Sequence, residues 1–460
     1  MRLRVFVFIL GRNRENGFNE INTKNAGGDM ASALRTLGLV CLLASSGMAS
    51  AQDQPPVKVG VIGAFSGPSA AIGVSMREAV RLATTELNWK GGLNGRKIEL
   101  VERDDGDDPE KAERLVKDMI KNDKIEFAVG FTNNAVALRA LQPLQDAKIP
   151  VMVNVATDNA LTELFLPPMQ KDNYVFRNVA TDVAQANVIA REVLERGRYS
   201  KVAILAESSP YGRNGSETIK RQIYKRLQAA PWNAEADSST GWLRGGNGKF
   251  MPQPMIAMFQ PGQTNMSEMV SQAKAYGAEA LIVWGQAPEA VAIAKARNKL
   301  GWSVPLIGSS DLGTDAFIKL AGAHGAGARM PADFVADPIN SRRQEFLIAY
   351  RHQTNAELIA APTAAAQGYD SMLLLAAAVR QANSTQGPAV REALENLQGN
   401  VFGVICTYEK PFKKDDHEAI TPDMIVTGEI TNGRVGFAYK DEARAVILGK
   451  RSTREVANSR

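Results

Sequence analysis

The chain has 460 residues, of which 45% are hydrophobic and 22% are charged, so it is long enough to fold around two hydrophobic cores. The formal net charge is +5, but residues 1–51 carry six Arg or Lys and three Asp or Glu, which leaves the remainder nearly neutral. Because that remainder has no strong net charge and no basic stripe, we expect no nucleic-acid partner and no attraction to a membrane surface.

Residues 30–51 have the pattern of a secretory signal peptide. They combine one charged residue, an apolar core and a small-residue end, so we expect cleavage before Gln52 and export to the periplasm. Charged residues interrupt any apolar core in 1–29, and Met30 is therefore an alternative start. The apolar run 34–44 is shorter than the roughly 20 residues of a membrane span, so no stable membrane insertion is predicted.

The two cysteines allow no internal disulfide in the exported protein. Cys41 lies within the predicted signal after the bulky Val40, which disfavours lipidation. Cys406 is then left alone, and we expect it to be a buried apolar filler.

Strand and helix patterns alternate along the chain, which predicts parallel sheets with helices on both faces. The predicted strands lie near 57–63, 97–102, 125–130, 150–154, 201–206, 256–259, 279–284 and 304–308. The first is an apolar run that ends in the turn 65–68, and open α/β sheets bind ligands at such carboxyl ends. Ser66 in that turn is therefore a candidate ligand contact.

Two segments between the predicted elements have an unusual composition. Asp104–Asp108 predicts a loop and a helix cap, because Pro109 stands where a calcium-binding EF-hand loop needs glycine. The stretch 231–255 lacks periodicity and predicts a loop insertion. We favour an inert surface excursion for this insertion over a part of the ligand-binding rim.

Sequence signals for catalysis and for cofactors are lacking. The glycines of 245–248 and of 60–63 do not have the spacing of a phosphate-binding or dinucleotide-binding loop. Three scattered histidines, which we expect in loops or on helix surfaces, are too few for a metal triad. We predict no catalytic residue, no metal and no cofactor, with an exported enzyme or a sensor domain as the less favoured alternatives.

Several motifs together resemble the branched-chain amino-acid type of periplasmic solute-binding protein of ABC transporters, the type I periplasmic binding proteins. The matching segments are Val59–Gly67, Gly91–Leu100, Asp104–Pro109 and Ala206–Gly212. The resemblance implies a monomer that captures a small-molecule ligand and delivers it to ABC permease subunits. Such a protein is a receptor and not an enzyme.

The same resemblance implies an α/β fold of two doubly wound parallel-sheet lobes joined by a three-segment hinge. The chain would cross between the lobes near 178, near 332 and near 420. Lobe 1 would comprise 52–178 plus 333–420, and lobe 2 would comprise 179–332 plus 421–460.

In the first lobe, the resemblance places a ligand carboxylate at two strand ends. Asn133 and Asn134 follow one predicted strand, and Val155 and Thr157 follow the next. Asn134 stands where the family usually has serine, so a ligand other than an α-amino acid is also plausible. A helix cap is the alternative role of Asn134.

In the second lobe, Tyr211 matches an aromatic wall and Gln286 falls where the family often has another aromatic. Asp311 is the candidate partner of a ligand ammonium, and its alternative role is to cap a helix around 314–320. The expected ligand is a branched-chain or other neutral amino acid. The alternative is a small carboxylate, an aromatic acid or an amide.

Overall fold

The computed structural model describes residues 54–227, 242–244 and 250–447. The chain divides into two units, Met1–Gln54 and Pro55–Arg460, and the fold below is that of the second unit. The predicted signal peptide and its cleavage site lie outside the described residues. Within the described part of the chain, no helix combines the length and the apolar character that crossing a bilayer requires.

The first lobe is built on a parallel five-stranded sheet in the order β2-β1-β3-β4-β5. Its strands are β1 (Val57–Gly63), β2 (Ile98–Asp104), β3 (Phe127–Gly130), β4 (Val151–Val153) and β5 (Val175–Arg177). Its helices are α2 (Ala70–Trp89), α3 (Pro109–Asp118), α4 (Asn134–Asp146), α5 (Ala160–Glu163), α11 (Ser341–Thr354), α12 (Pro362–Ala382) and α13 (Gly387–Glu395). A short antiparallel pair, β13 (Asn400–Phe402) and β14 (Thr407–Glu409), completes it.

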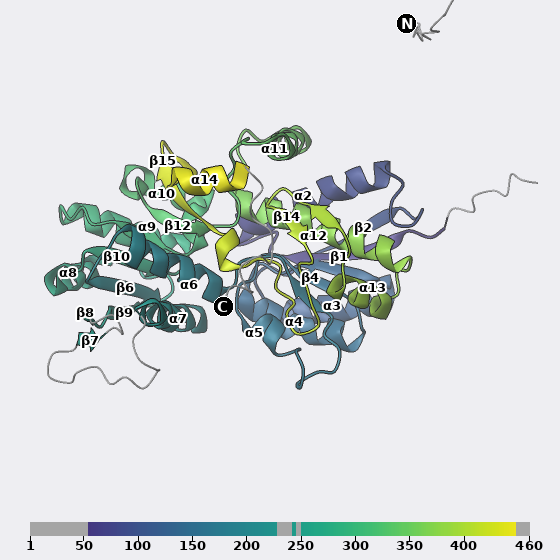
Figure 1. The fold of residues 1–460 in the computed structure, drawn as a ribbon, viewed down its shortest axis with the longest axis horizontal. Coiled ribbons are helices and arrows are strands. Elements are labelled where there is room, and N and C mark those ends of the chain that lie inside the picture. Colours follow the sequence, from purple (N-terminus) through teal and green to yellow (C-terminus); the bar gives the residue numbers. More distant parts are fainter. Residues whose placement is uncertain (1–53, 228–241, 245–249, 448–460) are drawn as a thin grey trace, which may run out of the picture. The chain divides into compact units, whose positions relative to one another are not determined.

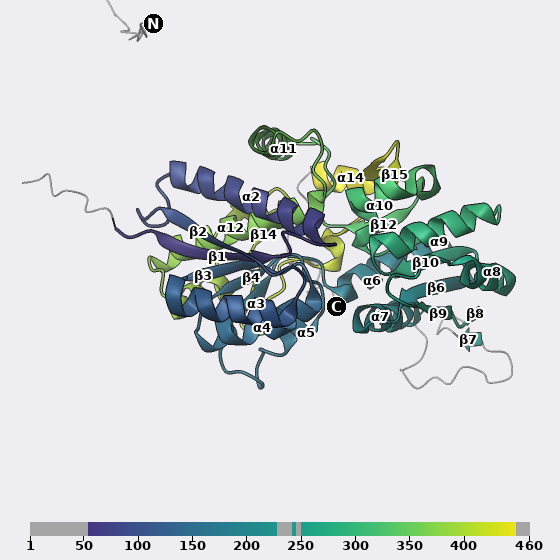
Figure 2. The same cartoon turned by 180° about the vertical axis from the view of Figure 1, so that it is seen from behind.

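Helices cover both faces of this sheet, because β1 is apolar on both sides. Val57, Val59 and Val61 are buried in one core with residues of α2 and α12. Ile62 lies in a second core with residues of α3 and α4. Figure 2 shows α2 on one side of β1 and the pair α3 and α4 on the other.

The second lobe is built on a seven-stranded sheet in the order β16-β15-β12-β11-β10-β6-β9 (Figure 1). Its strands are β6 (Val202–Glu207), β9 (Met255–Phe259), β10 (Ala280–Trp284), β11 (Leu306–Gly308), β12 (Arg329–Ala332), β15 (Val426–Thr431) and β16 (Arg434–Phe437). Its helices are α6 (Asp182–Arg191), α7 (Pro210–Arg226), α8 (Ser267–Tyr276), α9 (Ala287–Lys299), α10 (Asp315–Ala321) and α14 (Lys440–Ile447). The pairs β12–β15 and β15–β16 are antiparallel, and the other pairs are parallel.

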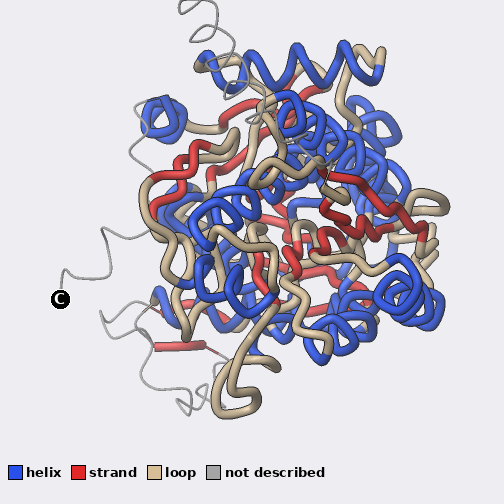
Figure 3. The backbone as a smooth tube through the Cα atoms, turned by 90° about the vertical axis from the view of Figure 1, so that its right-hand side faces the viewer, coloured by secondary structure: helices blue, strands red, loops and turns tan. Residues whose placement is uncertain are grey.

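The structure confirms the predicted fold class of two doubly wound α/β lobes. Each of the eight predicted strands coincides with an observed strand, and Figure 3 shows these strands enclosed by helices. The loop predicted at 231–255 is wrong in part. It contains an antiparallel hairpin of β7 (Trp242–Arg244) and β8 (Phe250–Pro252).

In each lobe, the first strand is followed by a helix that comes very close to the strand end. A Cβ atom on Gly73 of α2 would lie 2.0 Å from the carbonyl oxygen of Ala64, and one on Gly212 of α7 would lie 1.9 Å from that of Glu207. Only glycine permits this approach. The first turns of α2 and α7 are thereby fixed at the carboxyl ends of β1 and β6.

The chain leaves the first sheet after β5, which begins the first passage. It leaves the second sheet after β12, its last parallel strand, in the second passage. It returns to the second sheet at β15 in the third passage. The crossings expected near 178, 332 and 420, and the lobe boundaries that follow from them, remain predictions. The first two passages are tied together, because Asp333 accepts hydrogen bonds from the Ala180 N–H at 3.0 Å and from Gln367 at 2.7 Å.

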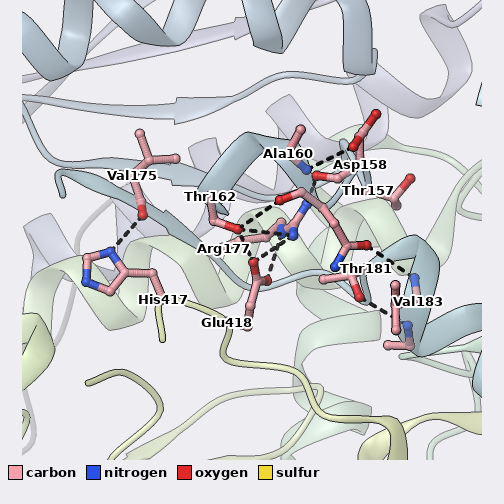
Figure 4. Close-up of polar contacts among 12 residues, drawn as sticks. Thr157, Asp158, Ala160, Thr162, Val175, Arg177, Thr181, Val183, His417 and Glu418 are labelled. Atoms are coloured by element: carbon pink, nitrogen blue, oxygen red, sulfur yellow. Dashed lines mark hydrogen bonds and ion pairs between the residues drawn. The ribbon is translucent and has the colours of Figure 1, made fainter. Parts of the chain in front are cut away.

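An ion pair between a fully buried arginine and a half-buried glutamate ties the first and third passages together (Figure 4). The fully buried Arg177 side chain donates two hydrogen bonds to Glu418, at 2.7 and 2.6 Å. It also donates to the Asp158 carbonyl at 2.5 Å, while the Thr162 hydroxyl donates to Glu418. Arg177, at the start of the first passage, therefore holds both the loop after β4, through Asp158, and the third passage, through Glu418.

Replacing Arg177 by methionine is expected to destabilise the protein by about 3 to 5 kcal/mol, because the partner carboxylate loses its charge-assisted bonds. The measurement is the urea unfolding midpoint followed by circular dichroism. The matched control is Arg196→Met at the ion pair with Asp441, whose side chain is 64% exposed. We expect the control to change stability by less than about 1 kcal/mol. Equal effects of the two substitutions would contradict the structural role of Arg177.

Candidate functional site

In the second lobe, the structure brings together two of the predicted site residues, Tyr211 and Asp311. Tyr211 lies in the first turn of α7 after β6, and Asp311 lies in a short turn, Ser310–Gly313, after β11. The Tyr211 hydroxyl donates to Asp311 Oδ2 at 3.0 Å, and the Ser309 hydroxyl donates to the same oxygen at 3.1 Å. The carboxylate therefore lies at the carboxyl ends of β6 and β11, the two parallel strands that flank β10 in the sheet.

The environment of Asp311 is not that of a helix cap. The cap of α10 is Thr314, whose hydroxyl accepts from the Phe317 N–H at 3.4 Å, so the alternative role considered for Asp311 is wrong. Burial raises the pKa of Asp311, the hydrogen bonds from Tyr211 and Ser309 lower it, and the charge of Glu207 raises it. The net pKa lies above the ordinary aspartate value, so a cation beside this carboxylate would relieve its unfavourable environment.

In the first lobe, the two asparagines have different roles. Asn133 caps α4, because its Oδ1 accepts from the Ala135 N–H at 2.9 Å. Asn134 is therefore not the cap, and that alternative is wrong. Its Oδ1 instead accepts from the backbone N–H groups of Thr157 and Asp158, at 2.7 and 3.1 Å.

A further acid, Asp182, connects these two groups of residues. It is the first residue of α6, and its N–H donates to the Thr157 carbonyl at 2.9 Å. Only 5% of Asp182 is exposed, and its Oδ1 accepts no hydrogen bond from the described residues. Asn134, Thr157, Asp182, Tyr211 and Asp311 together are called the polar cluster below.

The charge state of Asp182 is set by its burial. Burial raises its pKa, the hydrogen bond from Thr157 lowers it, and the neighbouring charge of Asp158 raises it again. Arg177 lowers the pKa and Asp311 raises it, and the result is about 7. The two parts of the polar cluster meet at α6, where the Asp182 N–H donates to the Thr157 carbonyl at 2.9 Å and Gln185 Oε1 accepts from the Ser310 N–H at 3.0 Å.

The other predicted site residues are not joined to the polar cluster by any hydrogen bond seen in the described part of the chain. Ser66 donates to Asp104 Oδ2 at 2.6 Å. Val155 is half-buried and packs against the first core. Gln286 is exposed and precedes α9 without capping it through its side chain.

Two further expectations about single residues are corrected. Cys406 is half-buried rather than buried, and it lines a cavity of about 240 Å³ with Arg342 and Thr407. His417 is a core residue rather than a surface one. It is 1% exposed and stacks on Phe176 with ring centroids 3.9 Å apart.

Comparison with known proteins identifies the class to which this fold belongs. The family described as "Periplasmic binding protein" matches residues 56–228 and 255–433. The leucine-specific-binding protein of Salmonella typhimurium is 25% identical over 378 residues, which cover 81% of this chain and 91% of that protein. The interruption of the family match falls on the predicted insertion at 231–255.

Solved structures share the fold. A leucine-binding protein LivK from Thermotoga maritima aligns with a TM-score of 0.68 at 19% identity, covering 83% of this chain and 98% of that one. A solute-binding protein of an ABC transporter from R. palustris, in complex with 4-hydroxybenzoate, aligns with a TM-score of 0.66 at 18% identity, covering 83% and 95%. The chain described here belongs to the periplasmic binding protein family, whose members are solute-binding receptors.

Asp182 makes the stability of the protein depend on pH in a defined direction. Its native pKa of about 7 lies well above the ordinary aspartate value, so the native state holds a proton that the unfolded state releases. Stability is therefore lost as the pH rises through this interval. Asp182→Asn removes that loss, and we expect its stabilising effect to be about 2 to 3 kcal/mol larger near about pH 8 than near about pH 5.

The measurement is the melting temperature of the ligand-free protein and of Asp182→Asn at the two pH values. The matched control is Asp441→Asn, because Arg196 holds the pKa of that exposed carboxylate below the ordinary value. Its effect should be the same at both pH values. A pH-independent effect of Asp182→Asn would contradict a buried, uncompensated carboxylate at this position.

Proposed function

We propose that this protein is the periplasmic receptor of an ABC importer and that it captures a small ammonium-bearing ligand at the polar cluster. The first candidate is a branched-chain or other neutral amino acid. The observation that carries the proposal is that α6 contacts both parts of the cluster: Asp182 at its start binds the Thr157 carbonyl, and Gln185 accepts from the Ser310 N–H beside Asp311. A ligand ammonium bound there would compensate both charges.

The similarity to amino-acid receptors supports this ligand class. The Salmonella relative is named for leucine, and the Thermotoga structure is that of a leucine-binding protein. Tyr211 is suited to contact an apolar part of the ligand, because its ring packs against Trp284 with centroids 5.6 Å apart. Asp311 then serves the ammonium group through its second oxygen.

A small carboxylate without an amine is the second candidate, because the R. palustris neighbour was solved with 4-hydroxybenzoate. The charges of the polar cluster count against it. An anion placed beside Asp182 and Asp311 would be repelled by both, and like charges at close quarters cost several kcal/mol. We therefore rank ammonium-bearing ligands first.

The remaining features of the proposal follow from membership of the family. The receptor is exported by a cleaved signal peptide, acts as a monomer, and delivers its ligand to permease subunits without turning it over. The lobes, at 52–178 plus 333–420 and 179–332 plus 421–460, close around the ligand by bending at the three passages. Asn133, Val155, Ser66 and Gln286 stay candidates for outer contacts.

Asp311→Asn is expected to weaken the binding of an ammonium ligand by about 2 to 5 kcal/mol, because one partner of a buried charge pair is lost. Thermal melting with a panel of neutral amino acids first identifies a ligand, since saturation at a hundred times the dissociation constant stabilises by about 2.7 kcal/mol. Calorimetric titration of that ligand then compares wild type with the variant.

The control variant is Asp315→Asn. Asp315 lies four residues further along, in the first turn of α10, and pairs with Lys319 on the surface. It should leave the affinity unchanged. Melting that responds to 4-hydroxybenzoate but to no amino acid would refute the leading candidate.

A further inference from the structure

A backbone hydrogen bond joins the two lobes outside the three passages. The Asp315 N–H, at the start of α10 in the second lobe, donates at 2.9 Å to the Ala360 carbonyl, in the loop between α11 and α12 of the first lobe. Asp315 is the first helical residue after the cap Thr314, and an N–H at that position has no acceptor within its own helix. The first lobe therefore supplies the acceptor that α10 lacks.

The first-lobe end of this bond is anchored to α2. Ile359 and Ala361, on either side of Ala360, are buried in the first core. The Ala361 N–H also donates to the Ser75 hydroxyl at 3.1 Å, and that hydroxyl donates to the Ala71 carbonyl at 2.7 Å. Because a glycine contact fixes the first turn of α2 at the carboxyl end of β1, the Ala360 carbonyl is held close to that edge of the first sheet.

The second-lobe end of the bond is connected to the polar cluster. The Thr314 N–H and the Thr314 hydroxyl both donate to the Asp311 carbonyl, at 3.2 and 2.8 Å. The side chain of the same Asp311 accepts from Tyr211 and Ser309. One hydrogen-bonded turn therefore links the candidate ammonium-binding carboxylate to the donor of the interlobe bond.

We propose that the hydrogen bond from the Asp315 N–H to the Ala360 carbonyl is an interlobe clasp, which stabilises the closed arrangement of the lobes and lengthens the residence time of the ligand. This inference rests on the proposed receptor function and adds the contact that retains the ligand. A bond made only between closed lobes shifts the equilibrium toward them, and the apparent affinity rises with the closed fraction. Opening costs little, because water can solvate both half-buried groups.

Replacing Asp315 by proline removes the donor and is compatible with the helix. Proline is favoured at the first helical position, and Thr314 before it has φ −81° and ψ 148°, the extended conformation that a residue before proline prefers. We expect Asp315→Pro to bind L-leucine about twofold to tenfold more weakly, the net contribution of one hydrogen bond. Calorimetric titration measures the affinity, and stopped-flow fluorescence should place the loss in the dissociation rate.

Two control variants separate the N–H from other effects of the substitution. The side chain of Asp315 takes no part in the clasp and pairs with Lys319 on the surface, so Asp315→Asn keeps the N–H and should bind L-leucine as the wild type does. Asp315→Pro should melt no lower than Asp315→Asn. Ser341→Pro places proline at the first position of α11, after an extended residue, and should leave the affinity unchanged.

Amide hydrogen exchange observes the clasp in the wild-type protein. An N–H at the first helical position exchanges rapidly unless an acceptor outside the helix protects it. We expect saturating L-leucine to slow the exchange of the Asp315 amide by about tenfold or more, because the closed lobes hold its acceptor in place. The exchange of the Ser341 amide should not change.

The outcomes separate the clasp from the proposed function. Equal binding of L-leucine by the wild type and Asp315→Pro would overturn the clasp and leave the receptor function in place. The same conclusion would follow if the Asp315 amide exchanged as fast as the Ser341 amide in the leucine complex. If neither L-leucine nor another neutral amino acid bound the wild type, the proposed function would be wrong, and the clasp would fall with it.

Discussion

The ion pair between Arg177 and Glu418 is the interaction on which the arrangement of the candidate site depends. It joins the end of β5 to the chain's third passage, and the same guanidinium holds the Asp158 carbonyl. Because Asp158 follows Thr157, this bond fixes the loop that contacts Asp182 at the start of α6. Fold and site are therefore coupled through one buried cation whose hydrogen-bonding capacity is largely satisfied within the protein.

The polar cluster shows the cost that the proposed binding site imposes on the fold. Asp182 is buried with an oxygen that accepts no bond from the described residues, and its pKa is raised to about 7 by burial. An aspartate in such a place destabilises the ligand-free protein at neutral pH. A cationic ligand would recover this free energy on binding, so the cost of burying Asp182 would become part of the affinity for an ammonium group.

The sequence allowed most of the fold to be predicted, because parallel strands buried on both faces are apolar runs between helix patterns. Val57–Gly63 and Ala280–Trp284 are such runs, and both are strands. The three-residue strand Val175–Arg177 was not predicted, since so short a segment has no periodicity. The pairs β13–β14 and β15–β16 were not predicted either, because pairing of short antiparallel strands depends on tertiary context.

The candidate site was predictable only in part. Tyr211 and Asp311 follow strand ends, which the pattern locates, but their hydrogen bond joins residues 100 positions apart. Asp182 was missed because nothing in its local sequence distinguishes it from an ordinary acid in the first turn of a helix. The role of Asn134 was also hidden. The two backbone N–H groups that donate to its Oδ1 lie 23 and 24 residues away, and only the folded chain brings them together.

The most direct measurement is mass spectrometry of the small molecule that the native receptor retains when it is purified from its own periplasm without denaturation. We expect one amine-containing compound per chain, released on unfolding, because the acids of the polar cluster require a cation. A retained carboxylic acid that lacks an amine would contradict an ammonium-binding site at Asp182 and Asp311.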